Sequence, residues 1–309
     1  MSRSGQTLAA KWWIFVGERF PLGAHGPMVL LFALGNFSMA ARLAGVVFAP
    51  WAFAASVLLS LSFFFRLRCF DEIKDYAVDV AVNPTRPLAR GLLQASQVKR
   101  MLAALILFEL GLAAWLGVRV LCVHGLAMIY SFLMYREFFI GRWLRPHLTT
   151  YALTHTLVSV LLGLSVATQA TLAGPLPWSK ALLTFVFINW FMFNLFEFAR
   201  KTFATSEERP AVESYSSLFG TYAAVALSLL QVGLSLGVLW LVSLQADALV
   251  RPLPRWGGPV ALLLALIPLG AAVGFAVRKS ESAARCFRAV VSGYLLICYT
   301  YLSWLGFAS

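Results

Sequence analysis

Residues 71–91 read DEIKDYAVDVAVNPTRPLARG and concentrate charge in a chain that is otherwise mostly apolar. Four carboxylates fall within nine residues and precede a turn with two arginines. The 309-residue chain is 60% hydrophobic and only 12% charged, whereas soluble domains are about one quarter charged. Apolar runs of about 20 residues, enough to cross the hydrocarbon core of a bilayer, recur along it. The composition therefore indicates a membrane protein with several spans.

We predict an all-α membrane protein with nine spanning helices in a single domain that covers residues 1–309. The expected spans are 28–48, 51–70, 100–117, 119–138, 149–171, 179–199, 216–243, 259–277 and 287–307. Residues 1–27 precede the first span. Within them, TLAAKWWIFVGERF at 7–20 predicts a short helix at the membrane interface, with a loosely ordered arm as the alternative.

Two connections, residues 71–99 and 200–215, are long and polar, and such connections often carry function. The positive-inside rule places both in the cytoplasm together with the N-terminus. Only five of the 25 Lys and Arg residues then lie outside: Arg42, Arg119, Lys180, Arg251 and Arg255. The net charge of +12 follows from this bias, so we expect no nucleic-acid partner. We expect a protein of the cell's inner membrane, surrounded by bilayer lipid.

Three acids in the first connection, Glu72, Asp75 and Asp79, have the i, i+3, i+7 spacing of one helix face. Asp71 lies near the same face. Like charges at this spacing repel each other, so we expect a bound cation to compensate them. Carboxylate oxygens suit Mg²⁺, which commonly completes its coordination with substrate phosphates. A solvated acidic helix is the alternative.

The turn that follows, NPTRPLARG at 83–91, places arginines beside these carboxylates. Asn83 and the two prolines favour a tight, extended turn, and Arg86 and Arg90 follow them. Guanidinium groups bind phosphate oxygens well. Carboxylates and arginines together predict a site for a diphosphate–metal complex. Anchoring at the membrane surface is the alternative for the arginines, and it is more credible for Arg90.

The stretch resembles the first signature of the UbiA superfamily of intramembrane prenyltransferases, N-D-x-x-D-x-x-x-D followed by N-x-x-R-P-L-x-x-G. The first part is matched by Asp71, Glu72, Asp75 and Asp79. The second part is matched by Asn83, Arg86, Pro87, Leu88 and Gly91. Two positions depart from the pattern, an Asp for the Asn and a Glu for the first Asp, and both keep an oxygen ligand. Nine spans and a second polar cluster extend the resemblance over most of the chain.

The family's second signature, D-x-x-D-x-x-x-D, is altered here to NLFEFARK at 194–201. Asn194, Glu197 and Lys201 keep the spacing, but one acid has become an amide and another a cation. The sequence therefore leaves open whether the site binds one Mg²⁺ ion or two. Lys201 would contact the diphosphate directly, or a later acid would replace the missing ligand. The candidates for that replacement are Glu207, Glu208 and Glu213. An ion pair between Glu197 and Lys201 is the purely structural alternative.

The resemblance implies a Mg²⁺-dependent transfer of a polyprenyl group from an isoprenoid diphosphate to a lipophilic acceptor, such as an aromatic one. Residues 71–99 and 200–215 would cap a cytoplasmic active site. The expected catalytic residues are Asp75, Asp79, Arg86 and Lys201. The expected diphosphate-binding residues are Asn83, Arg86, Arg90, Arg136 and Lys201. The expected metal ligands are Asp71, Glu72, Asp75, Asp79, Asn194 and Glu197.

Other functions are less compatible with the sequence. A UbiA-like protein that binds an isoprenoid diphosphate with altered or lost catalysis remains open, because the second cluster is degenerate. A phospholipid-type transferase would carry D-G-x-x-A-R, a string that does not occur here. A transporter would place its acids near the bilayer midplane. Glu109 lies in the middle of the expected span 100–117, where an acid is costly in lipid, and we expect it to face the bundle interior.

Overall fold

A computed structural model describes residues 6–172, 179–209, 212–245 and 253–308. Within these ranges the chain forms helices and one isolated bridge, between Arg209 and Val212, and no strand. The all-α expectation is therefore confirmed for the part that is described.

The longer helices are α2 (Leu22–Leu43), α3 (Pro50–Lys74), α5 (Ala95–Leu116), α6 (Val118–Tyr135), α9 (Val158–Ala170), α11 (Phe187–Arg200), α12 (Tyr215–Leu244), α13 (Gly257–Arg278) and α14 (Glu281–Phe307). The shorter elements are α1 (Leu8–Arg19), α4 (Tyr76–Val82), η2 (Glu137–Phe139), α7 (Gly141–Leu144), α8 (Leu148–Thr156), α10 (Lys180–Phe185) and η3 (Thr205–Glu207). α8 leads into α9 and α10 leads into α11, and each pair forms one span-length unit.

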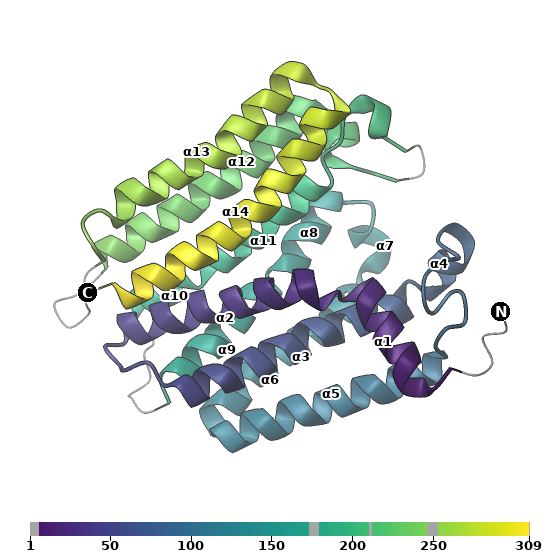
Figure 1. The fold of residues 1–309 in the computed structure, drawn as a ribbon, viewed down its shortest axis with the longest axis horizontal. Helices are drawn as coiled ribbons and strands as arrows, with labels where there is room; N and C mark the ends of the chain where they lie inside the picture. The colour runs from purple at the N-terminus through teal and green to yellow at the C-terminus, as the bar shows by residue number, and fades with distance from the viewer. Residues whose placement is uncertain (1–5, 173–178, 210–211, 246–252, 309) are drawn as a thin grey trace.

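The long helices pack as a closed ring. α2 packs on α3, α3 on α5, α5 on α6 and α6 on α9, and the order continues through α11, α12, α13 and α14. The ring closes because α14 returns to α2, and Figure 1 shows these two helices side by side. The largest core cluster extends through this bundle and includes Phe32, Phe63 and Phe185, all fully buried.

The outer faces of the helices remain apolar. Trp115, Trp240, Leu263 and Val277 are between 63% and 77% exposed, which suits contact with lipid rather than water. Within the described ranges, eight helical units are long and apolar enough to cross a membrane. The chain is an integral membrane protein.

The expected span at 100–117 corresponds to α5, which is not among those eight units. α5 has 22 residues but carries Lys99, Arg100 and Glu109, and these charges lower its apolarity. It packs between α3 and α6 all the same. Nine spans therefore stay a prediction, as does the cytoplasmic N-terminus.

α1 coincides with the helix expected at 7–20. The Thr7 hydroxyl accepts a hydrogen bond from the Ala10 amide at 3.3 Å and caps its start, as a helix N-cap normally does. Phe15 is fully buried against Cys69 and Phe70 of α3. Figure 1 shows α1 crossing the end of the bundle near α3 and α5. The alternative of a loosely ordered arm is therefore wrong.

The acidic segment does not form one continuous helix. α3 ends at Lys74 and α4 begins at Tyr76, with Asp75 between them at φ −91° and ψ 1°. Glu72 and Asp79 are buried, at 1% and 3% exposure, whereas Asp75 is only partly buried. The expected common helix face is therefore wrong, because the chain breaks in the middle of the motif.

Candidate active site

A cavity of about 350 Å³ brings the two sequence clusters together. From the first cluster it is lined by Asp71, Asp75 and Arg86. From the second cluster it is lined by Glu197 and Lys201. These residues are far apart in the sequence and meet because the ends of α3 and α11 face the same space.

Asp71 and Asp75 are the carboxylates that the first cluster offers to the cavity. Asp71 lies 3.6 Å from Arg68 and 3.9 Å from Lys74, both on its own helix. Burial raises the pKa of Asp75; Lys74 opposes this shift, and the neighbouring Asp71 and Asp79 carboxylates add to it. A carboxylate that is costly to ionise in this setting gains stability from an added cation.

Asp79 orients the turn instead of lining the cavity. Arg86 Nη1 donates to Asp79 Oδ2 at 2.7 Å, and Asn83 Nδ2 donates to Asp79 Oδ1 at 3.2 Å. Leu88 is buried in the cluster that contains Phe15. Gly91 ends the turn at φ 75°, a conformation that glycine adopts more readily than other residues. The motif thus fixes Arg86 at the cavity wall through Asp79.

Glu72, which we expected to bind the metal ion, forms an ion pair with helix α1 instead. Arg19 of α1 forms an ion pair with Glu72 and itself lines the cavity. Arg90 pairs with Glu18 of α1 at 2.7 and 2.8 Å. Neither Glu72 nor Arg90 lines the cavity. Arg136 does not line it either; its side chain is exposed, and its guanidinium lies 5.7 Å from the Phe139 ring centre.

The second cluster is held by ion pairs. Glu197 Oε2 lies 2.5 Å from Arg200 Nε, and Glu197 Oε1 lies 3.0 Å from Lys201 Nζ. The purely structural pairing of Glu197 with Lys201 is thus confirmed, and both residues still line the cavity. Asn194 is fully buried, and its Oδ1 accepts a hydrogen bond from Thr156 Oγ1. Asn194 does not line the cavity.

The acids of residues 200–215 have other partners. Arg288 of α14 donates to Glu207 at 2.7 and 3.0 Å, and this hydrogen bonding lowers the pKa of Glu207. Glu208 accepts hydrogen bonds from Ser214 and Ser216. Glu213 is exposed. None of these three carboxylates lines the cavity.

The sequence left several residues of the cavity wall unassigned. These are Arg19, Arg68, Lys74, Tyr151 and Arg200. Lys74 Nζ donates to Tyr151 Oη at 3.0 Å, and the Tyr151 and His155 rings stack with centroids 3.9 Å apart. Arg68 and Lys74 stand three residues from Asp71, a helical spacing that predicts proximity. Arg19 and Tyr151 have no such local signal.

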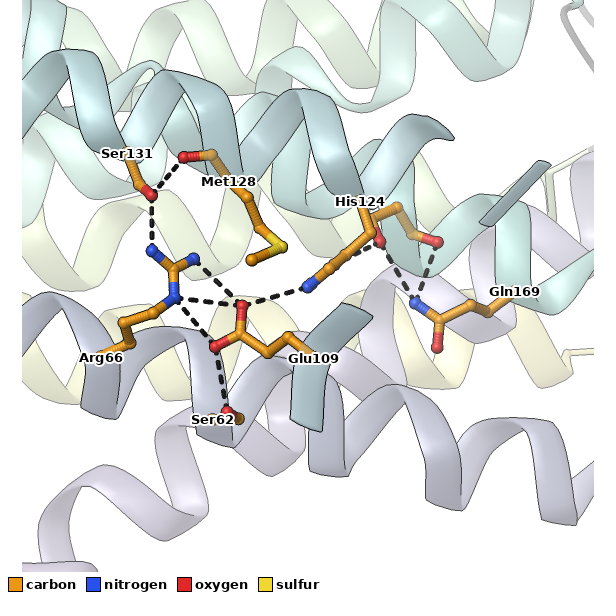
Figure 2. Close-up of polar contacts among 8 residues, drawn as sticks. Ser62, Arg66, Glu109, His124, Met128, Ser131 and Gln169 are labelled. Atoms are coloured by element: carbon orange, nitrogen blue, oxygen red, sulfur yellow. Dashed lines mark hydrogen bonds and ion pairs between the residues drawn. The ribbon is translucent and has the colours of Figure 1, made fainter. Parts of the chain in front are cut away.

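Figure 2 shows a buried network of polar contacts around Arg66 and Glu109. Arg66 and Glu109 are both fully buried; Arg66 Nε donates to Glu109 Oε1 at 2.9 Å and Arg66 Nη2 to Oε2 at 3.0 Å. His124 lies 3.3 Å from Glu109 on its other side. Arg66 Nη1 also donates at 2.7 Å to Ser131, which lies at the cavity wall. Glu109 therefore faces the bundle interior as predicted, and the network joins α3, α5 and α6.

The carboxylates of the first cluster fit one Mg²⁺. Asp71 and Asp75 present two carboxylates to the cavity, and Mg²⁺ in proteins is often held by one or two carboxylates plus substrate phosphates. In the part of the chain that the structure describes, no group of three His, Cys, Asp or Glu side chains could hold a metal ion by itself. An ion at this place would therefore need phosphate oxygens as additional ligands.

No family model matches the sequence, and no curated protein matches it. Solved structures do match the fold, among them the following two. A UbiA homologue from Aeropyrum pernix K1, in its apo form, is 17% identical with a TM-score of 0.59, over 87% of this chain and 97% of its own. A digeranylgeranylglyceryl phosphate synthase is 14% identical with a TM-score of 0.55, over 96% of this chain and 97% of its own. The chain therefore shares its fold with these proteins, one of them a UbiA homologue, as the resemblance of its motif at 71–91 implied.

Proposed function

We propose that this chain is a membrane prenyltransferase that moves a polyprenyl group from an isoprenoid diphosphate to a lipophilic acceptor. The observation that carries this proposal is the cavity that joins Asp71 and Asp75 with Glu197 and Lys201. Residues from both UbiA-type signatures thus face one space. One of the two structural neighbours is named as a synthase of digeranylgeranylglyceryl phosphate, which supports a prenyl lipid as the class of product.

The cavity wall suits both parts of such a donor. Its charged side chains, with Arg86 and Lys201 among them, would hold the diphosphate by charge-assisted hydrogen bonds. Leu67, Phe70 and Met134 line the same cavity and would contact the first carbons of the prenyl chain. The surrounding bilayer would take the rest of an apolar tail and would also deliver a lipophilic acceptor.

Asp71 and Asp75 would hold Mg²⁺ against the diphosphate. When bound, Mg²⁺ supplies positive charge that stabilises the leaving diphosphate. Arg86, held in place by Asp79, would donate to diphosphate oxygens while the bond between carbon and oxygen breaks. The bonding electron pair leaves with the diphosphate. The allylic carbon, now carrying positive charge, then bonds to the nucleophilic atom of the acceptor, and the proton that this atom loses passes to solvent water.

A diphosphate-binding protein with lost catalysis is the second candidate. It is favoured by one observation, the engagement of Glu197 with Arg200 and Lys201 where the family has an acidic cluster. Both candidates share the donor site and differ only in whether a product forms. The cytoplasmic orientation of the site, in the inner membrane, belongs to either proposal.

Lipid mass spectrometry tests the enzymatic proposal, and the acceptor does not have to be identified beforehand. A strain that lacks the gene should lose one prenylated lipid, and the wild-type chain should restore it. Asp75→Asn should fail to restore it, because the substitution removes a carboxylate at the proposed metal position. Glu281→Gln is the control; its carboxylate is exposed, pairs with Arg285 at 3.6 Å and lies outside the cavity.

Full restoration by Asp75→Asn would contradict the assigned role of the first cluster. An unchanged lipid profile in the deletion strain, together with tight binding of geranylgeranyl diphosphate to the purified chain, would favour the non-catalytic candidate. Absence of both a product and donor binding would reject both.

A further inference from the structure

Basic side chains outnumber acidic ones on the wall of the cavity. The six basic residues are Arg19, Arg68, Lys74, Arg86, Arg200 and Lys201. The three acidic residues are Asp71, Asp75 and Glu197. Two further carboxylates, Glu72 and Asp79, lie behind the wall and pair with Arg19 and Arg86. With six positive and five negative groups, the set carries one net positive charge.

This charge balance bears on the number of metal ions. A phosphate monoester carries up to about two negative charges near neutral pH, and the second phosphoryl group of a diphosphate ester adds about one more. One divalent cation would raise the charge of the set to about three and balance such a ligand. A second divalent cation would leave about two uncompensated positive charges in a partly buried site.

The second cluster is also a poor metal site in its geometry. Both oxygens of Glu197 are engaged, one by Arg200 and the other by Lys201. The Oδ1 atom of Asn194 accepts from Thr156, and its side chain is fully buried away from the cavity wall. The position of the family's third acid is occupied by Lys201, whose ammonium is a donor of hydrogen bonds and no ligand for a metal ion.

One of the basic residues of the cavity wall, Arg19, comes from a helix that carries neither motif. It reaches the cavity from α1, outside both signatures, and its contact with Glu72 runs through Nε. Its side chain is 19% exposed and that of Lys201 is 26% exposed, so both remain accessible. The helices that carry Arg19 and Lys201 are held in place by packing. Helix α1 packs on α3 through Phe15, and helix α11 packs on α9 and α12.

We propose that Arg19 and Lys201 bind the diphosphate oxygens directly and take the place of a second metal ion, so that the site uses one divalent cation. This inference rests on the proposed function, because it assumes a diphosphate ligand in the cavity. Lys201 acts as a point charge with three donors and keeps its contact with Glu197 through one of them. Arg19 donates from its guanidinium while Glu72 fixes its orientation.

Metal counting tests this inference without an acceptor. The purified full chain is saturated with inorganic diphosphate and titrated with Mn²⁺, an oxygen-seeking substitute for Mg²⁺ that is visible by electron paramagnetic resonance. We expect one Mn²⁺ per chain and no spin coupling between two ions. Two coupled Mn²⁺ ions per chain would overturn the inference, whatever the behaviour of any variant.

Calorimetry in EDTA tests the roles of the Arg19 and Lys201 side chains in diphosphate binding. Wild-type chain should still bind inorganic diphosphate without metal, although more weakly than with Mg²⁺. Lys201→Gln and Arg19→Gln should each weaken this metal-free binding about tenfold to a hundredfold, as expected for a hydrogen bond to a charged group. Arg145→Gln is the matched control, since Arg145 pairs with Glu137 at 2.7 Å and does not line the cavity.

The outcomes separate this inference from the function on which it rests. Donor binding that is abolished by EDTA, or unchanged in both variants, overturns the direct role of the cations and leaves the transferase proposal in place. Failure of the wild-type chain to bind either inorganic diphosphate or geranylgeranyl diphosphate with Mg²⁺ overturns both. A repeat of the Mn²⁺ titration with geranylgeranyl diphosphate should again give one ion per chain, and two ions would overturn the inference for the full donor.

Discussion

The buried charge of Glu109 is neutralised by a partner on a neighbouring helix. Glu109 and Arg66 are both fully buried and meet through three hydrogen bonds at 2.9, 3.0 and 3.1 Å. Ser62 also donates to Glu109 at 3.0 Å, and His124 lies on its other side. A carboxylate placed in α5 is tolerated because α3 supplies the compensating charge.

Replacing either Glu109 or Arg66 alone should therefore destabilise the fold far more than replacing both. Glu109→Ala leaves the Arg66 guanidinium buried and unpaired and should destabilise the fold by about 3–5 kcal/mol. The double variant Glu109→Met with Arg66→Met should be much less destabilised, because apolar side chains replace the pair. Thermal unfolding in detergent, compared across the set, checks this. Equal losses in the single and double variants would contradict a pair that acts as a unit.

At the same scale, the sequence identified the chemistry of the site better than the role of each acid. Asp71, Asp75 and Arg86 were expected from the residues themselves, Glu197 and Lys201 from the resemblance to the second UbiA signature, and all five line one cavity. Local spacing gave no sign that Glu72 would meet Arg19, because that contact depends on how α1 packs. It also gave no sign that Asp79 would turn towards Arg86, since this follows from the break at Asp75.

The connection from α11 to α12 is shaped by its own acids. Glu207 ties it to α14 through Arg288, which also donates to the Thr202 carbonyl at 3.0 Å. Glu208 ties it to the start of α12 through Ser214 and Ser216. Both acids therefore hold this connection against the neighbouring helices.

The Glu207 contact should make this connection sensitive to acid. Arg288 lowers the pKa of Glu207 in the folded chain below its usual value near 4.5. A carboxyl with a depressed pKa stabilises the fold above that usual value, and the contribution is lost as the pH falls through the lowered pKa. The difference in thermal unfolding midpoint between wild type and Glu207→Gln should therefore be largest near pH 7, should shrink as the pH falls below 4.5, and should vanish only below the lowered pKa of folded Glu207.

Glu213→Gln serves as the control because Glu213 lies in the same connection and is exposed. It should leave the unfolding midpoint unchanged across this pH range. A Glu207→Gln variant that shows the same pH profile as wild type would contradict the assigned contact.

Elements as a whole were the easiest part to predict. Apolar runs of sufficient length indicated the spans, and the helix expected at 7–20 is present as α1, while its place at the membrane interface stays a prediction. The break between α3 and α4 was missed, because helical spacing of acids does not reveal where a backbone bends. Helix α5 was predicted as a span from its apolar run. It packs within the ring, but its charged residues exclude it from the helices that are apolar enough to cross a membrane.

At the scale of the whole molecule, the closed ring explains why two distant motifs form one site. Helix α3, in which the first motif begins, and helix α11, which carries most of the second, both pack on α9. Their ends, with the residues that follow, therefore face the same cavity. The sequence by itself indicates one polar cluster in each half of the chain, and the packing order of the helices explains why the two halves meet.

The central claim is that this cavity binds an isoprenoid diphosphate, and calorimetric titration of the purified chain with geranylgeranyl diphosphate in Mg²⁺ tests it most directly. We predict saturable binding of one molecule per chain. Competition by inorganic diphosphate should show that the charged end occupies the cavity. Binding that is absent, or that survives unchanged when Arg86 and Lys201 are both replaced by Gln, would contradict the claim.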